Sequence, residues 1–142
     1  MKTTIFFLIC ILALSSAYIE LTHEDGNDIL KELKKRNNGV IVVLFVAEAE
    51  IGTELAQTNM DYEFHLINKV LKNYPSFKYA KVNAVDKNYS DLVKATGISI
   101  SDLYNSPSVL ISEDRDGEWI HGDISSSKLK QVARYYNERV NE

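Results

Sequence analysis

The strongest hydrophobic pattern in the chain is an unbroken apolar run from Val40 to Ala47 that is rich in β-branched residues. Such a run is typical of a strand covered on both faces in a parallel sheet. We therefore predict the central strand of the fold over residues 40–47. Residues 18–21 are predicted as a short extended start, and residues 77–85 as a further strand.

Helical periodicity flanks this run on both sides. Asn27 is suited to cap a helix that stops at residues 37–39, where Asn-Asn-Gly follows the last apolar residue. A longer amphipathic helix is predicted over residues 54–74, because apolar residues recur at steps of three and four until Pro75. The predicted apolar faces are Ile29, Leu30 and Leu33 in the first helix, and Ala56, Met60, Phe64, Ile67, Leu71 and Tyr74 in the second.

A short helix and a hairpin are predicted next. Asn88 or Ser90 opens the helix, and Gly97 stands where a left-handed cap would end it. Residues 98–106 are predicted as a polar connection. Two strands then flank a turn over residues 113–117, in which Asp-Gly is a strong turn signal.

The final helix is predicted to start in the serine cluster at residues 125–127. The whole order is strand, helix, strand, helix, strand, helix, strand, strand, helix, which predicts an α/β fold. The final helix is predicted to bury Leu129, Val132, Ala133, Tyr136 and Val140.

Residues 1–17 have the pattern of a cleavable secretory signal peptide. Lys2 precedes an apolar run over residues 5–14, and Ser-Ser-Ala follows with the small residues of a cleavage site. The run is shorter than the roughly 20 residues that a membrane-spanning helix needs. We expect cleavage after Ala17, a single domain over residues 18–142, and no membrane insertion of that domain. An uncleaved signal anchor is the alternative.

Cleavage would remove Cys10, the one cysteine of the chain. The chain has 16 basic and 20 acidic residues, with no basic stripe beyond an ordinary helix face at residues 34–36, so nucleic acid is not an expected partner. The secretory compartment is oxidising, yet the mature chain has no cysteine with which to form a disulfide.

The element order and three segments resemble the thioredoxin-like superfamily. Residues 43–48 resemble the strand that leads into the active site, and residues 79–88 resemble the third strand with its exit. Residues 106–111 resemble the loop and strand that carry the family's cis-proline. Given the signal pattern, the closest resemblance is to domains of the protein disulfide isomerase family. It implies a three-layer α/β/α sandwich with a mixed central sheet and a C-terminal hairpin plus helix.

The cysteine motif of that family is missing. Its Cys-x-x-Cys position falls on Glu50, Ile51, Gly52 and Thr53, and Leu44 matches the buried acid that serves the thiols. Thiol exchange needs a reactive thiolate and a second thiol that resolves the mixed disulfide. We therefore expect no enzymatic exchange, no catalytic residue and no cofactor.

Other chemistry at this position has little support. Glu48 and Glu50 form a close pair of carboxylates, but solvated acids are the favoured interpretation over acid–base catalysis. Thr53 is favoured as a helix cap, since neither Thr53 nor Ser106 has an identifiable neighbouring base. The three histidines lie far apart without the spacing of a metal site, so no metal is expected.

The resemblance also implies a peptide-binding ledge at Pro107. In thioredoxin-like domains the cis bond before this proline exposes backbone groups that pair with an extended peptide. A cis Ser106-Pro107 bond would preserve the ledge, and Tyr104 in the preceding segment could contact the peptide. The alternative is that the turn alone requires the proline.

Asn88 begins an Asn-Tyr-Ser sequon for N-glycosylation at a predicted exposed connection. The C-terminal residues do not form a retrieval signal of the Lys-Asp-Glu-Leu type, so the endoplasmic reticulum lumen and secretion both stay open as locations.

Two functions are expected from these patterns. The first is a redox-inactive thioredoxin-like module of the secretory pathway that binds extended or unfolded polypeptide without covalent chemistry. The second is a structural or docking subunit held by a fixed protein partner. A disulfide oxidoreductase, by fold alone, is a distant third.

Overall fold

The computed structural model describes residues 18–48, 53–122 and 126–141. The predicted signal peptide lies outside the described residues, and so do Glu50, Ile51 and Gly52 of the position matched to Cys-x-x-Cys.

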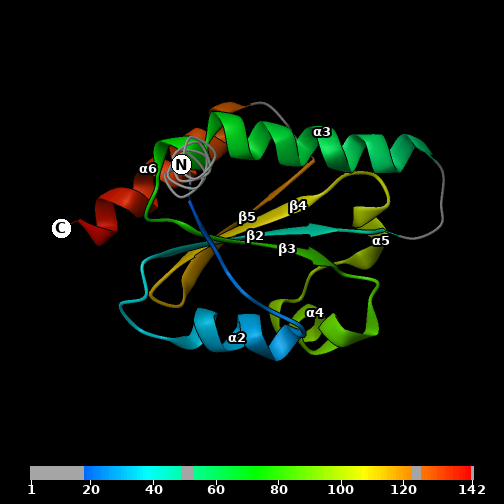
Figure 1. Ribbon diagram of the computed structural model, residues 1–142, viewed down its shortest axis with the longest axis horizontal. Coiled ribbons are helices and arrows are strands. Elements are labelled where there is room, and N and C mark those ends of the chain that lie inside the picture. The colour runs from blue at the N-terminus through cyan, green and yellow to red at the C-terminus, as the bar shows by residue number, and fades with distance from the viewer. Residues whose placement is uncertain (1–17, 49–52, 123–125, 142) are drawn as a thin grey trace, which may run out of the picture.

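A five-stranded mixed sheet in the order β1-β3-β2-β4-β5 forms the middle layer of the fold (Figure 1). β2 pairs in parallel with β3 and antiparallel with β4, and every residue of β2 is buried. The predicted central strand is thereby confirmed. The strands are β1 (Ile19–Glu20), β2 (Val40–Val46), β3 (Lys78–Asn83), β4 (Ser108–Glu113) and β5 (Asp116–His121).

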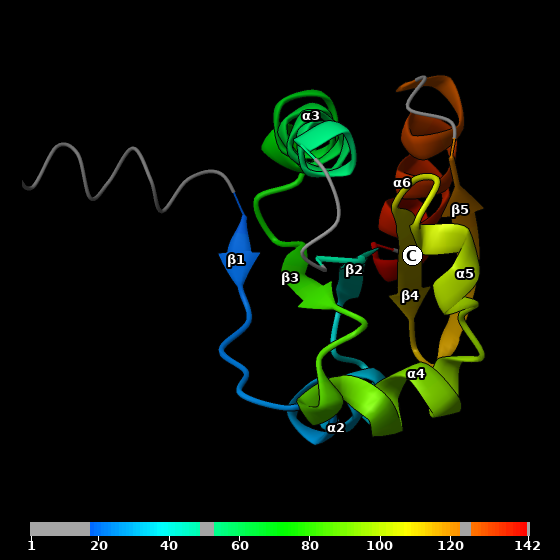
Figure 2. The same ribbon diagram turned by 90° about the vertical axis from the view of Figure 1, so that its right-hand side faces the viewer.

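Helices cover both faces of this sheet (Figure 2). Val42 and Leu44 of β2 belong to a core shared with α3 and α6, while Ile41 and Val43 belong to the opposite core with α2 and α4. The predicted three-layer α/β/α sandwich, with its C-terminal hairpin and helix, is confirmed. The helices are α2 (Gly26–Lys34), α3 (Thr53–Lys69), α4 (Ser90–Thr96), α5 (Ile100–Leu103) and α6 (Ser126–Val140), with 3₁₀ turns η1 (Leu71–Asn73) and η2 (Lys87–Tyr89).

The cap of α2 lies two residues before the predicted one. Asp25 Oδ1 accepts a hydrogen bond from the Asp28 N–H at 3.1 Å, and Asp28 Oδ2 accepts from the N–H groups of Asp25 and Glu24. These two backbone bonds lower the pKa of the Asp28 carboxyl. Asn27 lies inside the first turn, because the reciprocal pair of aspartates already satisfies the free N–H groups of this helix start.

The buried face of α3 also differs from the prediction. Met60 and Phe64 are 63% and 70% exposed, whereas Tyr62 and Leu66 are buried in the core. The prediction was wrong at Met60 and Phe64, because a second stripe with the same helical spacing completes the core there. This stripe consists of Tyr62, Leu66 and Val70. Further along the predicted face, Ile67, Leu71 and Tyr74 do pack in this core. The helix ends at Lys69, before η1.

Two predictions about the chain after α4 are corrected. Residues 98–106 contain the short helix α5, whose Leu103 is buried. The hairpin turn falls on Asp114 and Arg115, which have φ of 48° and 70° as a two-residue type I′ turn requires. The Asp-Gly pair therefore lies in β5.

The final helix begins at Ser126, inside the predicted serine cluster, and buries the predicted core residues apart from Val140, which is exposed. Arg139 in its last turn bonds to Asp116 at 2.8 Å and lies 3.1 Å from Glu113, so this turn is attached to the hairpin instead of the core. Of the helices in the described ranges, none combines the length and apolar character that crossing a membrane takes.

Candidate functional site

The candidate site lies at the end of the sheet where β2 and β3 finish. The chain leaves β2 through Ala47 and Glu48 and is described again from Thr53, the first residue of α3. β4 starts at the same end, because Ser108 pairs with Phe45. The topology thus brings the start of α3 and the segment around Pro107 to one end of the molecule.

Leu44 occupies the position matched to the buried acid of the resembled family. It is 0% exposed and packs in the core beneath α3 and α6. A carboxylate there would be removed from water among apolar side chains, which is costly without a partner.

A peptide-binding ledge at Pro107 was expected only if the Ser106-Pro107 bond were cis. The described residues contain no cis peptide bond, so the Ser106-Pro107 bond is trans. Pro107 is buried and its carbonyl accepts a hydrogen bond from the Gly122 N–H at 3.3 Å, while the Ser106 N–H donates to the Asp102 carbonyl at 3.4 Å. A short helix that sequence patterns did not indicate supplies this last acceptor, so backbone groups next to the bond are used within the chain.

Tyr104 follows α5 and is 41% exposed, and its contact with a peptide stays a prediction. Further along the chain, Ser108 Oγ lies 2.6 Å from His121 Nδ1 across the β4–β5 ladder. Sequence reasoning missed this pair, which only the hairpin register brings together. Ser108 is buried and His121 is exposed. The bond joins β4 to the edge strand β5.

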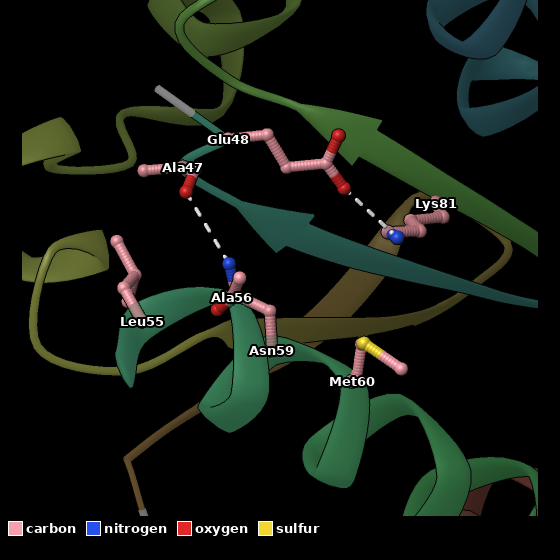
Figure 3. Close-up of a pocket in the computed structure, with 7 residues that line it drawn as sticks. All are labelled: Ala47, Glu48, Leu55, Ala56, Asn59, Met60 and Lys81. Carbon is pink, nitrogen blue, oxygen red and sulfur yellow. Dashed lines mark hydrogen bonds and ion pairs between the residues drawn. The ribbon is translucent and has the colours of Figure 1, made fainter. Parts of the chain in front are cut away.

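A cavity of about 330 Å³ opens between α3 and the ends of β2 and β3 (Figure 3). We call it the α3 cavity. Its lining comes from the exit of β2, from the face of β3 that meets α3, and from the first turns of α3. The lining residues are Ala47, Glu48, Leu55, Ala56, Asn59, Met60 and Lys81.

Asn59 is the buried polar residue of this lining, at 3% exposure. Its Nδ2 donates to the carbonyl oxygen of Ala47 at 3.3 Å. Its Oδ1 accepts no hydrogen bond from any of the residues that the structure describes. A buried acceptor without a partner costs about 1–3 kcal/mol. This oxygen has almost no accessible surface, so a ligand in the α3 cavity does not reach it.

Lys81 links two carboxylates beside the cavity. Its Nζ lies 2.9 Å from Glu48 Oε1 and 3.6 Å from Glu63 Oε1. Partial burial acts to lower the pKa of Lys81, but the hydrogen bond that Lys81 donates to Glu48 and the charges of Glu63 and Glu48 outweigh it, so the pKa is raised. Lys81 is therefore cationic at neutral pH.

Glu63 has a second partner on β3. Its Oε2 accepts a hydrogen bond from the Tyr79 hydroxyl at 2.6 Å. Burial of Tyr79, together with this bond and the charge of Glu63, raises the pKa of the phenol. The carboxylate is thus held between a lysine and a protonated tyrosine, which fixes the charged wall of the α3 cavity.

Met60 continues the apolar surface from the cavity onto the outside of α3. Phe64 stands one turn further along the same helix, and both side chains are exposed. The helical pattern pointed to these residues, but it assigned them to the core. Their exposure makes them part of a surface that extends away from the cavity mouth.

The remaining predicted features lie apart from this cavity. Asn88 is exposed in η2, where its N–H donates to Asp86 Oδ1 at 3.0 Å, and its glycosylation stays a prediction. His23 Nδ1 lies 2.7 Å from the Tyr89 hydroxyl. Across the described ranges, no three His, Cys, Asp or Glu side chains gather into a group that could hold a metal ion.

Solved structures with the same arrangement are thioredoxins. Thioredoxin O2 from Arabidopsis thaliana in the oxidized state is 18% identical with a TM-score of 0.56, covering 85% of this chain and 96% of that one. Thioredoxin from Trypanosoma brucei brucei is 16% identical with a TM-score of 0.58, covering 90% and 95%. Mitochondrial thioredoxin 3 from Saccharomyces cerevisiae, in its oxidized form, is 16% identical with a TM-score of 0.56, covering 85% and 97%.

The chain therefore has a thioredoxin-like fold. At these identities the likeness concerns the fold alone, and function has to be argued from the site. No protein-family model matches the sequence, and no curated protein matches it.

Proposed function

We propose that this chain binds polypeptide non-covalently and does not exchange disulfides. The sequence after Cys10 contains no thiol. Leu44 occupies the position where the resembled family has a buried acid that serves the thiols. Exchange proceeds through a mixed disulfide, so a chain without a thiol has no means to form the intermediate.

The observation that carries the binding function is the α3 cavity, a mostly apolar pocket with Lys81 and Glu48 at its wall. Pockets that bind ligands are mostly apolar and contain a few placed polar groups. Leu55 and Met60 supply apolar lining, and Lys81 and Glu48 supply polar groups. The Pro107 segment offers fewer free hydrogen-bonding groups, because the Ser106 N–H and the Pro107 carbonyl form hydrogen bonds within the chain.

Polypeptide suits this site better than a small polar metabolite. A polypeptide presents apolar side chains and N–H donors a few ångströms apart, which matches the apolar lining and the carboxylate of Glu48. Met60 and Phe64 extend the apolar surface beyond the cavity, so a longer segment of bound chain has somewhere to lie. An exposed apolar surface next to a pocket is a common mark of interaction sites.

The proposed setting is the secretory pathway, as in the protein disulfide isomerase family that the sequence resembles. The support is the signal pattern of residues 1–17 and the exposed sequon at Asn88. Secretion of a tagged full chain, with the N-terminal residue and the mass at Asn88 measured, tests this setting: an unprocessed Met1 would contradict it.

A docking subunit is the second candidate function. Phe64, the most exposed large apolar side chain described, is what a permanent partner would be expected to cover. In that case the chain co-purifies with one partner at fixed stoichiometry, and Phe64→Ser releases it.

The binding function is tested by fluorescence anisotropy of a labelled, carboxymethylated ribonuclease A, which is permanently unfolded. The full chain is expected to bind it equally with and without dithiothreitol. Ala56→Trp fills the α3 cavity and should abolish binding. Gln57→Trp adds the same side chain one residue later, outside the lining, and should leave binding intact. Equal binding by the two variants, or no binding by the wild type, would contradict the proposal.

A further inference from the structure

We infer that the polypeptide segments bound at the α3 cavity are cationic as well as apolar, with a lysine or arginine within a few residues of an aromatic or aliphatic side chain. The inference rests on the proposed function and states which segments the site selects. It concerns the outer surface of α3 that continues from the cavity, where apolar side chains stand between carboxylates.

Two exposed apolar residues form a ridge on the outside of α3. Met60 and Phe64 are four residues apart, so their side chains lie on the same side of the helix, one turn from each other. They are 63% and 70% exposed. Met60 also lines the cavity (Figure 3), so the ridge starts at the cavity mouth. A bound chain that fills the cavity and continues along α3 therefore lies over this ridge.

Acidic residues flank the ridge on both sides. At about 3.6 residues per turn, Asp61 lies on one side of the line from Met60 to Phe64, and Glu63 lies on the other. Asp61 is exposed, and no ion pair joins it to any residue that the structure describes. Its Oδ1 accepts a hydrogen bond from the Gln57 amide at 2.8 Å, but this donor is neutral and leaves the charge in place.

The cavity wall adds to this negative charge. Lys81 is the basic residue of the lining, and its Nζ lies 2.9 Å from Glu48 Oε1 and 3.6 Å from Glu63 Oε1. One ammonium is thus shared by two carboxylates. Together with Asp61 these groups have an excess of negative charge. Lys69 does not offset it at the cavity, because it lies in the last turn of α3, beyond the ridge.

Charge complementarity decides between the possible occupants of this surface. A lysine or arginine beside a bound apolar side chain is attracted to the flanking carboxylates, whereas an acidic segment is repelled. A second copy of this chain would place the same carboxylates against one another, and a nucleic acid would bring phosphates to them. A cationic, apolar polypeptide segment is therefore the partner that fits both the ridge and its flanks.

The test is fluorescence anisotropy of the full chain with three labelled ten-residue peptides. All three contain two phenylalanines and two leucines, and four further positions are lysine, glutamine or glutamate. We expect the lysine peptide to bind about fivefold or more tightly than the glutamine peptide, because it forms two or three exposed ion pairs. The glutamate peptide should bind most weakly. In about 1 M NaCl the preference should fall below about twofold, because the Debye length is then about 3 Å.

Two matched variants locate the effect. Asp61→Lys reverses one flanking charge and should reduce the preference for lysine over glutamate about threefold or more. Asp91→Lys makes the same change at an exposed residue of α4, which covers the opposite face of the sheet (Figure 2), and should change the preference less than about 1.5-fold. Phe64→Ser removes part of the ridge without changing a charge, so it should weaken all three peptides by a similar factor.

Equal affinity of the wild type for the lysine and glutamate peptides would overturn the inference. Equal effects of Asp61→Lys and Asp91→Lys would also overturn it, because the preference would then come from the net charge of the chain and not from this surface. The proposed function fails separately. If unfolded ribonuclease A binds and Ala56→Trp blocks it while the peptides are not distinguished, the chain binds polypeptide but the charge selection is wrong. If neither ribonuclease A nor any of the peptides binds, both are wrong.

Discussion

Asn59 Nδ2 donates a hydrogen bond to the carbonyl oxygen of Ala47 across 3.3 Å and so attaches the early part of α3 to the exit of β2. The same side chain leaves Oδ1 buried and unpaired. Half of this amide contributes to the fold, and half costs free energy that an apolar residue would avoid.

Asn59→Leu should therefore have a free energy of unfolding within about 1 kcal/mol of the wild type, because the lost bond to Ala47 is offset by removal of the unpaired oxygen. Urea unfolding followed by circular dichroism measures it. Leu66→Ala, on the same helix and fully buried, is the control and should cost about 2–5 kcal/mol. A loss from Asn59→Leu as large as that of the control would show that the amide is structural.

Leu44→Asp should destabilise the fold by about 3 kcal/mol or more, because it removes a buried apolar side chain and places a carboxyl in the core. Leu44→Met keeps the volume and should cost less than about 1.5 kcal/mol. Denaturant midpoints compare the two variants. If the aspartate is tolerated as well as the methionine, the position still accepts the acid of the resembled family.

The cap of α2 offers a test that separates the structure from the sequence pattern. Asp25→Ala should cost about 1 kcal/mol, because Asp25 caps the helix. Asn27→Ala should change stability by less than about 0.5 kcal/mol, because Asn27 is an exposed residue inside the first turn. The opposite ranking in thermal unfolding would place the cap where the sequence pattern alone predicted it.

Glu32 predicts a pH dependence of stability. Hydrogen bonds from Asn38 and Lys35 lower the pKa of its carboxyl below the usual 4.5. A carboxyl with a lower pKa in the folded state stabilises the fold above its unfolded pKa, and this contribution is lost as the pH falls through the folded value. Unfolding free energies measured from pH 6 downward should thus decline below about pH 4.5, and Glu32→Gln should show a shallower decline. If the unfolding free energies of the wild type and Glu32→Gln decline in parallel as the pH falls, the lowered pKa of the Glu32 carboxyl is wrong.

The sequence was sufficient for the order of elements apart from the short helix α5, because a continuous β-branched run such as residues 40–47 has few interpretations. It was not sufficient for details that depend on the partner layer. Two stripes of α3 have the same spacing, and the sheet contacts the one with Tyr62 and Leu66. The pattern alone gives no means of choosing between them.

The same limitation explains what was missed at the candidate site. The contact of Asn59 with Ala47 can be predicted only when the buried face of α3 is known. Lys81 reaches the wall of the cavity because β3 pairs in parallel register with β2. The ledge at Pro107 was inferred from family resemblance, whereas α5 and the trans bond give that segment a different backbone. Long-range packing, and not local pattern, decides each of these cases.

The central claim is that unfolded polypeptide binds in the α3 cavity without thiol chemistry. Its most direct test is NMR shift mapping of the full chain with carboxymethylated ribonuclease A in the presence of reductant. The account predicts that the Asn59 side-chain amide and the Met60 methyl signals shift, while Tyr104 and Ser106 do not. Shifts at Tyr104 and Ser106, with Asn59 and Met60 unchanged, would contradict it and place binding at the Pro107 segment.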